Sequence, residues 1–287
     1  MKNIRLYWGL AKPRILSLVL VTTTFGFLLG ARGFDSAIRL CLTLLGVACS
    51  TGGAAMLNNY LERDLDGKML RSRDRALPAG LIKPHRALTL GVGLVLFRVL
   101  LLAWKVSLLI GFLVLLAGFL YVLVYTPLKR ITWVNASFGA IPGAIPPMAG
   151  WVAATDRLDP CAWVLFAILF AWQHSHFYAI AWIFRGDYRA AGFKMLSVVD
   201  PSGKRMFRHT IAFSILLLAV SLLPSVVGVT GRPYCWGALL SGTLMLVPAI
   251  RFEREQELAD ARRLLKARPI SSTAVASYNA GYLPARL

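Results

Sequence analysis

The feature that most constrains this chain is a series of long apolar runs. Eight of them stand out, over residues 15–30, 37–57, 87–104, 106–127, 133–154, 161–184, 209–228 and 234–250. A helix of about 20 apolar residues crosses the hydrocarbon core of a bilayer. Only 16% of the 287 residues are charged, whereas soluble domains hold about 25%. The sequence therefore predicts an all-α, polytopic transmembrane bundle, folded as one domain over residues 1–287.

The net charge of +19 lies mostly on one side of this expected bundle. Of the 32 Lys and Arg residues, 26 fall in the N-terminus, the 58–86 segment, the 128–132 link, the 185–208 segment and the tail from Arg251. Eight spans place these segments on one side, which the positive-inside rule makes cytoplasmic. The lipid bilayer is the expected partner of this charge. We expect no nucleic-acid partner, because no basic patch interleaved with aromatic residues occurs in a soluble module.

The long polar connections after the second and sixth runs are on this basic side. Loops that face a bundle are places where a site can be built, so we expect a central cavity open toward the cytoplasm. The tail after Arg251 is polar and helix-forming until Pro269. The residues beyond Pro269 leave a ninth span undecided.

The fifth run contains three prolines, Pro142, Pro146 and Pro147. Proline removes a backbone donor, so these residues are expected to kink or interrupt the helix. Gly139 and Gly143 form a pair that permits close helix packing. Irregular backbone at membrane depth persists only where protein or a water-filled cavity satisfies it. Two interpretations stay open, a merely kinked span and the wall of a cavity.

The stretch NNYLERDLDG follows the second run and carries oxygen-bearing side chains at a spacing of four. On a continuing helix Asn58, Glu62 and Asp66 face one side, whereas Asp64 lies off this stripe. Two carboxylates on one face repel each other unless a cation neutralises them. Mg²⁺ takes oxygen ligands and is often held by one or two carboxylates and substrate phosphates. The stripe therefore predicts a Mg²⁺ site, with a solubilising face or helix cap as the alternative.

Arginines follow these acids directly, in the stretch RSRDRALPAG. Arg71, Arg73 and Arg75 have the planar fork that binds phosphate through two hydrogen bonds. The positive-inside rule alone also accounts for them. The acids and arginines at one membrane face together indicate a metal and a polyphosphate.

A second polar motif, YTPLKRITWVN, follows the fourth run. Its polar side chains recur at near-helical spacing, at Tyr125, Lys129, Thr132 and Asn135. Pro127 is expected to break the helix and make this segment a loop with donors pointing into the bundle. Lys129 and Arg130 can neutralise a diphosphate without a second metal. The alternative is an inside-positive flank.

A third motif, AWQHSHFYAIAWIFRGDY, places two histidines in the sixth run. On a helix His174 and His176 point about 200° apart, so they cannot both bind one metal. One of them can be an axial ligand or an acid–base group; the alternative is a hydrogen-bonded histidine within the bundle. Aromatic residues surround them and suit a flat apolar ligand or a carbocation, or an ordinary bilayer interface.

Together, residues 58–80, 125–156 and 172–203 resemble the intramembrane aromatic prenyltransferase superfamily. Within it they are similar to the protoheme IX farnesyltransferases, also called heme o synthases. The Tyr-Thr-x-x-Lys-Arg segment carries most of this resemblance, because other members of the superfamily have a second acidic motif there. The Trp-Gln-x-x-His-Phe segment is also typical of the heme enzymes.

The resemblance implies nine spans, a Mg²⁺ cofactor and location in a bacterial or organellar inner membrane. It implies transfer of a farnesyl group from farnesyl diphosphate to heme b, which is substrate and not cofactor. The product, heme o, would serve terminal oxidase assembly, with a heme a synthase as a downstream partner. The implied metal ligands are Asn58, Glu62 and Asp66, and the implied diphosphate contacts are Arg71, Arg75, Lys129, Arg130 and Asn135. The implied heme residue is His176. The implied catalytic residues are Asp66, Lys129 and Tyr125.

Three features depart from the family. Glu62 stands where the family usually has Asp, the pair His174-Ser175 replaces an apolar-Pro pair, and the ninth span is unconvincing. Other functions therefore stay open. They are prenyl transfer to a phenolic or quinone-precursor acceptor, membrane transport, and a non-enzymatic role in assembly.

Overall fold

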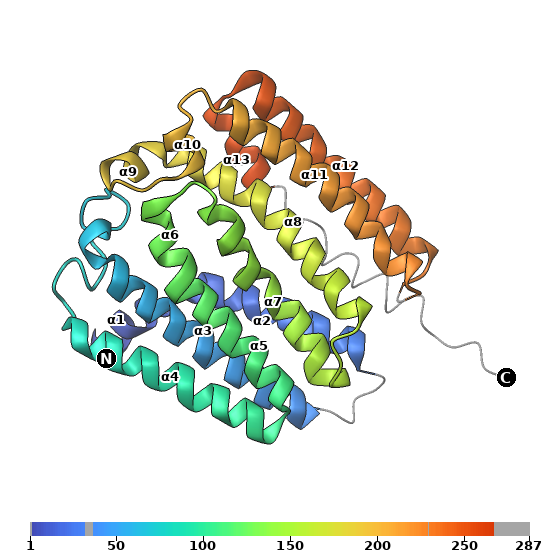
Figure 1. The fold of residues 1–287 in the computed structure, drawn as a ribbon, viewed down its shortest axis with the longest axis horizontal. Helices are drawn as coiled ribbons and strands as arrows, with labels where there is room; N and C mark the ends of the chain where they lie inside the picture. Colours follow the sequence, from blue (N-terminus) through green and yellow to red (C-terminus); the bar gives the residue numbers. More distant parts are fainter. Residues whose placement is uncertain (1, 32–36, 229, 267–287) are drawn as a thin grey trace.

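The computed structural model describes residues 2–31, 37–228 and 230–266, and over these residues the chain is entirely helical outside its turns and links (Figure 1). The long helices are α2 (Pro13–Gly30), α3 (Ala37–Asp66), α4 (Pro84–Lys105), α5 (Leu108–Phe119), α7 (Asn135–Thr155), α8 (Pro160–Ile183), α11 (Lys204–Val226) and α12 (Arg232–Glu255). The short ones are α1 (Lys2–Leu10), η1 (Leu120–Tyr125), α6 (Thr126–Ile131), α9 (Arg185–Ala190), α10 (Leu196–Val199) and α13 (Leu258–Lys266). The all-α prediction is confirmed.

Seven helical segments of the described chain are long and apolar enough to cross a membrane. The segment Leu108–Ile131, which joins α5, η1 and α6, is one of them. The eight expected runs are all helical, but α7 is not among the seven, because its glycines, prolines and polar residues lower its hydropathy. The residues beyond Pro269, which leave a ninth span undecided, lie outside the described residues. The chain is an integral membrane protein.

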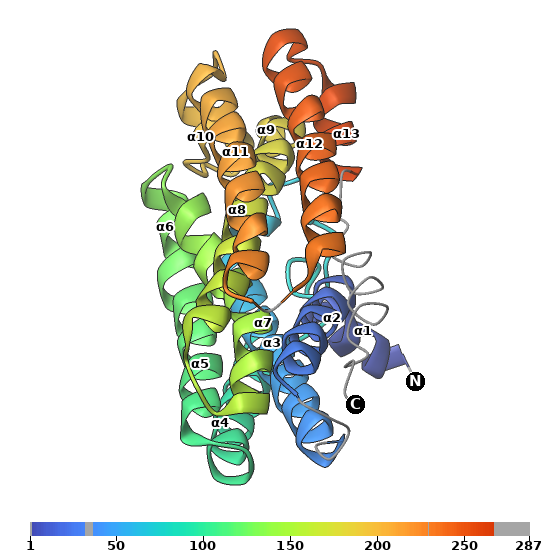
Figure 2. The ribbon, with the colours of Figure 1, turned by 90° about the vertical axis from the view of Figure 1, so that its right-hand side faces the viewer.

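Two apolar clusters hold the bundle together. The first joins α2, α3, α4, α5 and α7 around residues such as Phe27, Leu102 and Val152. The second joins α8 to the α11–α12 hairpin and α13 around residues such as Tyr178, Phe207 and Phe252. Figure 2 shows this hairpin beside α8, with α13 against its end. Helix α3 ends beside α6, at the end of the bundle that also carries α9 and α10 (Figure 1).

Helix α7 is the most enclosed of the long helices, with 15 of its 21 residues buried. It is continuous from Asn135 to Thr155 and includes all three prolines. The prolines were expected to kink or interrupt this span, and the structure shows no interruption. Each proline removes only its own backbone donor, and α7 is enclosed by α2 on one side and α8 on another, so tertiary packing outweighs the lost bonds.

Glycines let α2 and α7 approach backbone to backbone. A Cβ added at Gly26 would collide with the Pro147 carbonyl, and one added at Gly150 would collide with the Thr23 carbonyl. Small residues at helix contacts let the helices pack closely. In a membrane this packing stabilises the bundle, because apolar side chains gain nothing by leaving lipid for another helix.

We expect Gly150→Ala to destabilise the protein by about 1–3 kcal/mol, the cost of overpacking a tight contact. Thermal unfolding in detergent measures the change. Gly93→Ala in α4 is the matched control, since a Cβ there meets nothing within 4 Å. Equal stability of the two variants would contradict the packing described.

The fourth span stays helical through Pro127, so the expectation of a loop there is wrong. The chain instead widens into a π-helical turn, Leu120–Tyr125, and Pro127 takes its place in the first turn of α6. Proline is tolerated there because the first turn has no intrahelical use for its missing donor. π-Helical turns inside α-helices occur frequently at functional sites.

Candidate active site

The acidic stripe lies on one buried face of α3, as its spacing predicts. Asn58, Glu62 and Asp66 are 1%, 4% and 1% exposed. The Asp64 side chain is 76% exposed beside Arg63 and faces away from the stripe. Helix α3 continues to Asp66, nine residues beyond the apolar run. Carboxylates buried in this way require counter-charges.

Each residue of the stripe meets one positively charged side chain. Lys12 comes from the α1–α2 link, Lys129 from α6 and Arg75 from the connection after α3. The contacts are Lys12 Nζ donating to Asn58 Oδ1 at 2.6 Å, Lys129 Nζ to Glu62 Oε1 at 2.7 Å, and Arg75 Nη1 to Asp66 Oδ2 at 2.8 Å. Three basic side chains thus face two carboxylates, an arrangement suited to a polyanion.

The orientation of the Asn58 amide follows from its neighbours. Its Nδ2 donates to Thr126 Oγ1 at 3.0 Å, and that hydroxyl donates to the Tyr121 carbonyl of the π-helical turn at 2.8 Å. The amide oxygen of Asn58 is therefore directed toward Lys12, and as an acceptor it can bind a cation there. Without the wide turn, α5 and α6 would present different residues to α3.

Lys12 is the site residue that the sequence analysis missed. It was counted only as positive-inside charge, although it precedes Pro13 at the start of a span. Its backbone is left-handed, with φ of 53°. Its ammonium also lies 3.4 Å from the Tyr121 hydroxyl. Burial, together with the nearby charges of Lys129 and Arg75, lowers the pKa of Lys12 to about 7.

Tyr125 forms a wall beside Lys129. The Lys129 ammonium lies 4.5 Å from the centre of the Tyr125 ring, within cation–π range. The ring fits against Gly139, where an added Cβ would lie 2.6 Å from Tyr125 Cε2. Gly143 likewise makes room for the amide of Gln173. The Gly139–Gly143 pair therefore accommodates side chains, whereas backbone contact between helices occurs at Gly26 and Gly150.

Arg71 and Arg130 are exposed at the rim and do not pair with the acids. Arg71 donates to the Tyr188 hydroxyl at 2.8 Å and lies 4.6 Å from the centre of the Phe184 ring. Arg130 donates to the Leu61 carbonyl at 2.9 Å. Both guanidinium groups keep further donors for an anion, because each has five.

Asn135 is not brought together with these cations. It is 0% exposed, and its amide nitrogen donates to the carbonyls of Thr132 at 2.6 Å and Lys194 at 3.2 Å. Both amide hydrogens are therefore used to hold two backbone segments. Its amide oxygen is buried and has no hydrogen-bond partner among the described residues, so the diphosphate contact that the resemblance implies stays a prediction.

The two histidines have different environments, as their spacing predicts. His174 is fully buried, its Nε2 lies 3.0 Å from Ser137 Oγ, and its ring stacks on Phe213 at 3.6 Å. His176 is half-buried and stacks on Trp172 at 4.9 Å. His174 thus fits the interpretation of a hydrogen-bonded bundle histidine, which leaves His176 as the candidate for contact with a flat ligand.

We expect His174→Ala to lower stability by about 1–3 kcal/mol, because it leaves buried partners unpaired. His176→Ala should lower stability less, because the His176 ring is only half-buried, and it should weaken binding of the flat ligand. Thermal unfolding and steady-state kinetics separate the two effects. Equal losses of stability would contradict the assignment.

Comparisons with known proteins identify the family. The sequence profile of the UbiA prenyltransferase family matches residues 19–272. This chain belongs to that family. A protoheme IX farnesyltransferase of Solibacter usitatus is 40% identical over 269 residues, which cover 90% of this chain and 92% of the relative. One of Salinibacter ruber is 43% identical over 262 residues, covering 91% and 92%.

Solved structures of the family share the fold. A digeranylgeranylglyceryl phosphate synthase has a TM-score of 0.80 at 14% identity, covering 98% of this chain and 99% of the synthase. A UbiA homologue of Archaeoglobus fulgidus, bound to DMAPP and Mg²⁺, has a TM-score of 0.67 at 16% identity, covering 91% and 99%. At these identities the likeness is one of fold.

Proposed function

We propose that this protein transfers the farnesyl group of farnesyl diphosphate to a vinyl group of heme b, releases diphosphate and gives heme o. The observation that carries the proposal is the buried stripe of Asn58, Glu62 and Asp66, matched by three cations at 2.6–2.8 Å. The names of the protoheme IX farnesyltransferase relatives support heme as the acceptor. Lys129 lies where other members of the superfamily have a second acidic motif, and this difference also supports heme as the acceptor.

The oxygen atoms of the stripe fit a Mg²⁺ ion. They are buried, lie on one face, and each accepts a hydrogen bond from a basic side chain. A metal ion would bind these same oxygen atoms in place of those hydrogen bonds. A carboxylate pair with an amide oxygen is a hard donor set. Mg²⁺ held there would supply positive charge to the leaving diphosphate.

The cations of the chain have the complementary role of binding the diphosphate. Lys12, Lys129 and Arg75 lie next to the stripe, so their donors can turn from the carboxylates to phosphate oxygens when a metal neutralises the acids. Arg71 and Arg130 extend this charge to the rim. Preorganised charge in a buried site stabilises the negative charge that develops as the C–O bond breaks.

The carbon chemistry needs no protein nucleophile. The diphosphate leaves with the electron pair of the C–O bond, and the π electrons of the heme vinyl group form the new C–C bond. Water adds to the resulting cation and loses a proton. Tyr125, beside Lys129, is our candidate for positioning this water, and His176 for contacting the heme. The surrounding helices exclude water until the capture step.

We also propose that the basic end of the bundle, with the N-terminus, lies on the cytoplasmic side of a bacterial or organellar inner membrane, by the positive-inside rule. A cavity between the helices would open at this end. A heme a synthase is the proposed recipient of the product for terminal oxidase assembly.

Lys12→Met should raise the KM for farnesyl diphosphate about tenfold, the expected loss when one charge-assisted hydrogen bond of about 1.5 kcal/mol is removed. Steady-state kinetics with varied farnesyl diphosphate give the value. Arg14→Met, an exposed neighbour in α2, is the control. An unchanged KM in Lys12→Met would exclude it from the diphosphate site.

Acceptor competition tests the function. The purified protein in detergent is given farnesyl diphosphate, Mg²⁺ and equal concentrations of heme b and a phenolic quinone precursor. We expect only the heme to gain the farnesyl and water masses. Prenylation of the phenol alone would replace the heme proposal with the first alternative.

A further inference from the structure

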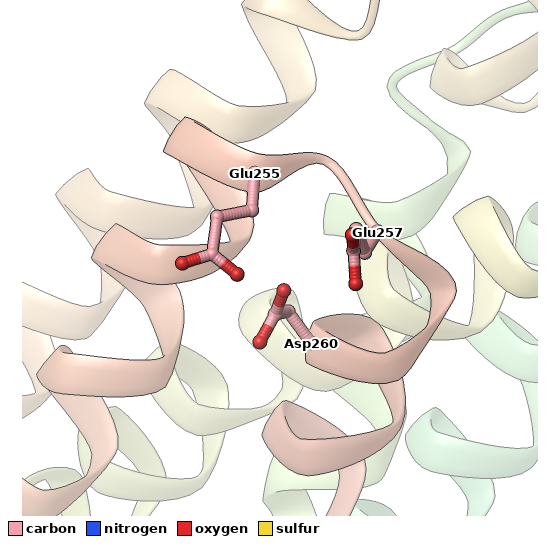
Figure 3. Close-up of side chains that lie close together, drawn as sticks. All are labelled: Glu255, Glu257 and Asp260. Carbon is pink, nitrogen blue, oxygen red and sulfur yellow. The ribbon is translucent and has the colours of Figure 1, made fainter.

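A second group of acidic side chains lies far along the chain from the stripe, where α12 ends. Figure 3 shows Glu255, Glu257 and Asp260 converging across the turn between α12 and α13. One carboxylate oxygen from each lies within 4.8 Å of the others. Gln256, which forms the turn, has a left-handed backbone with φ of 55°. In a chain with 13 acidic and 32 basic residues, three acids at one turn require a physical reason.

Asp260 is the residue that points to a ligand. It is 0% exposed, and its side chain is directed between the two glutamates (Figure 3). Its Oδ1 accepts from Arg263 Nη1 at 2.8 Å. Its Oδ2 is buried and has no hydrogen-bond partner within the described ranges. A buried carboxylate oxygen left unpaired is costly.

Helix capping does not account for this carboxylate. An acid in the first turn of a helix commonly accepts from a backbone N–H at the N-terminus. Asp260 is in the first turn of α13, yet its Oδ2 accepts from no such group in the described part of the chain. Arg263 pairs with Asp260, and among the described residues Glu255 and Glu257 form no ion pair.

A divalent cation has the matching charge and size. Ca²⁺ binds carboxylate oxygens at about 2.4 Å, so oxygens on opposite sides of the ion are about 4.8 Å apart. The three oxygens lie within that span. Glu255 and Glu257 are exposed, which leaves room for water in the irregular shell that Ca²⁺ accepts and Mg²⁺ does not.

We propose that Glu255, Glu257 and Asp260 form a Ca²⁺ site that fastens α13 to the end of α12. Ala261 and Leu264 of α13 are buried against the second apolar cluster. Trp182 of α8 donates its indole N–H to the Gln256 carbonyl at 3.3 Å. The ion therefore holds the turn at which α12, α13 and α8 meet. Helix α8 also carries His176.

The test uses the full chain in detergent. Ca²⁺ is titrated in the presence of millimolar Mg²⁺, and Tm and Ca²⁺ binding by equilibrium dialysis are measured. We expect saturable binding that raises Tm by a few degrees. Glu257→Gln, at an exposed ligand, should weaken binding at least about tenfold without loss of fold. Asp260→Asn should abolish binding and keep the acceptor for Arg263.

Glu253→Gln is the matched control, because it removes one negative charge from the same helix end outside the cluster. It should bind Ca²⁺ as the wild type does. The proposal is overturned by a wild type with no saturable Ca²⁺ effect, by Glu257→Gln and Asp260→Asn variants that bind normally, or by a Glu253→Gln variant that loses as much as they do. None of these results depends on prenyl transfer, so the test is independent of the proposed function.

Discussion

Replacement of Asp66 by alanine is expected to lower heme farnesylation at least about 100-fold, as loss of one preorganised charged group in a reaction site does. The carboxylate is 1% exposed and holds Arg75 at 2.8 Å. Its loss would remove a proposed metal ligand and release the arginine from its position. The rate of heme o formation, followed by chromatography and mass, gives the effect.

Asp64→Ala is the matched control for this experiment. It removes the same group two residues away, from a side chain that is 76% exposed. We expect its rate to stay within about twofold of the wild type, since exposed charge pairs contribute little. A similar loss in both variants would mean that general surface charge, and not the buried stripe, controls the activity.

The second large effect is expected at Lys129. Lys129→Met leaves Glu62 charged and unpaired in a site where the two side chains are 13% and 6% exposed. Breaking a buried pair from one side costs about 3–5 kcal/mol of stability. Thermal unfolding should detect this loss together with a nearly complete loss of activity.

A double variant separates the two losses. Lys129→Met with Glu62→Gln removes both charges, so we expect most of the stability to return, because no uncompensated ion remains. Activity should stay absent, because the proposed metal ligand Glu62 and the proposed diphosphate contact Lys129 are both missing. Lys194→Met, at an exposed side chain, is the control. Recovery of activity in the double variant would show that the pair is only structural.

Much of the fold was predictable because apolar length and helical period are local properties. The runs near 20 residues became helices, and the i, i+4, i+8 spacing of Asn58, Glu62 and Asp66 became one buried face. The exposure of Asp64 followed from the same period. The different environments of His174 and His176 followed from their separation by two residues.

The features that the sequence did not indicate depend on contacts between distant segments. The contact of Lys12 with Asn58 spans 46 residues, and no local pattern indicates it. Pro127 is accommodated by a π-helical turn, and the prolines of α7 by packing against α2. Asn135 is held by the carbonyl of Lys194, 59 residues away. Local rules for proline and polar spacing cannot include such tertiary contacts.

We propose that the paired acids and cations around α3 carry out heme farnesylation. The most direct measurement incubates the purified wild type and Asp66→Ala side by side with heme b, farnesyl diphosphate and Mg²⁺, and follows the heme o mass and the released diphosphate. We predict equal amounts of both products from the wild type, and neither from Asp66→Ala or without Mg²⁺. Abundant heme o from folded Asp66→Ala, or none from the folded wild type, would contradict the account.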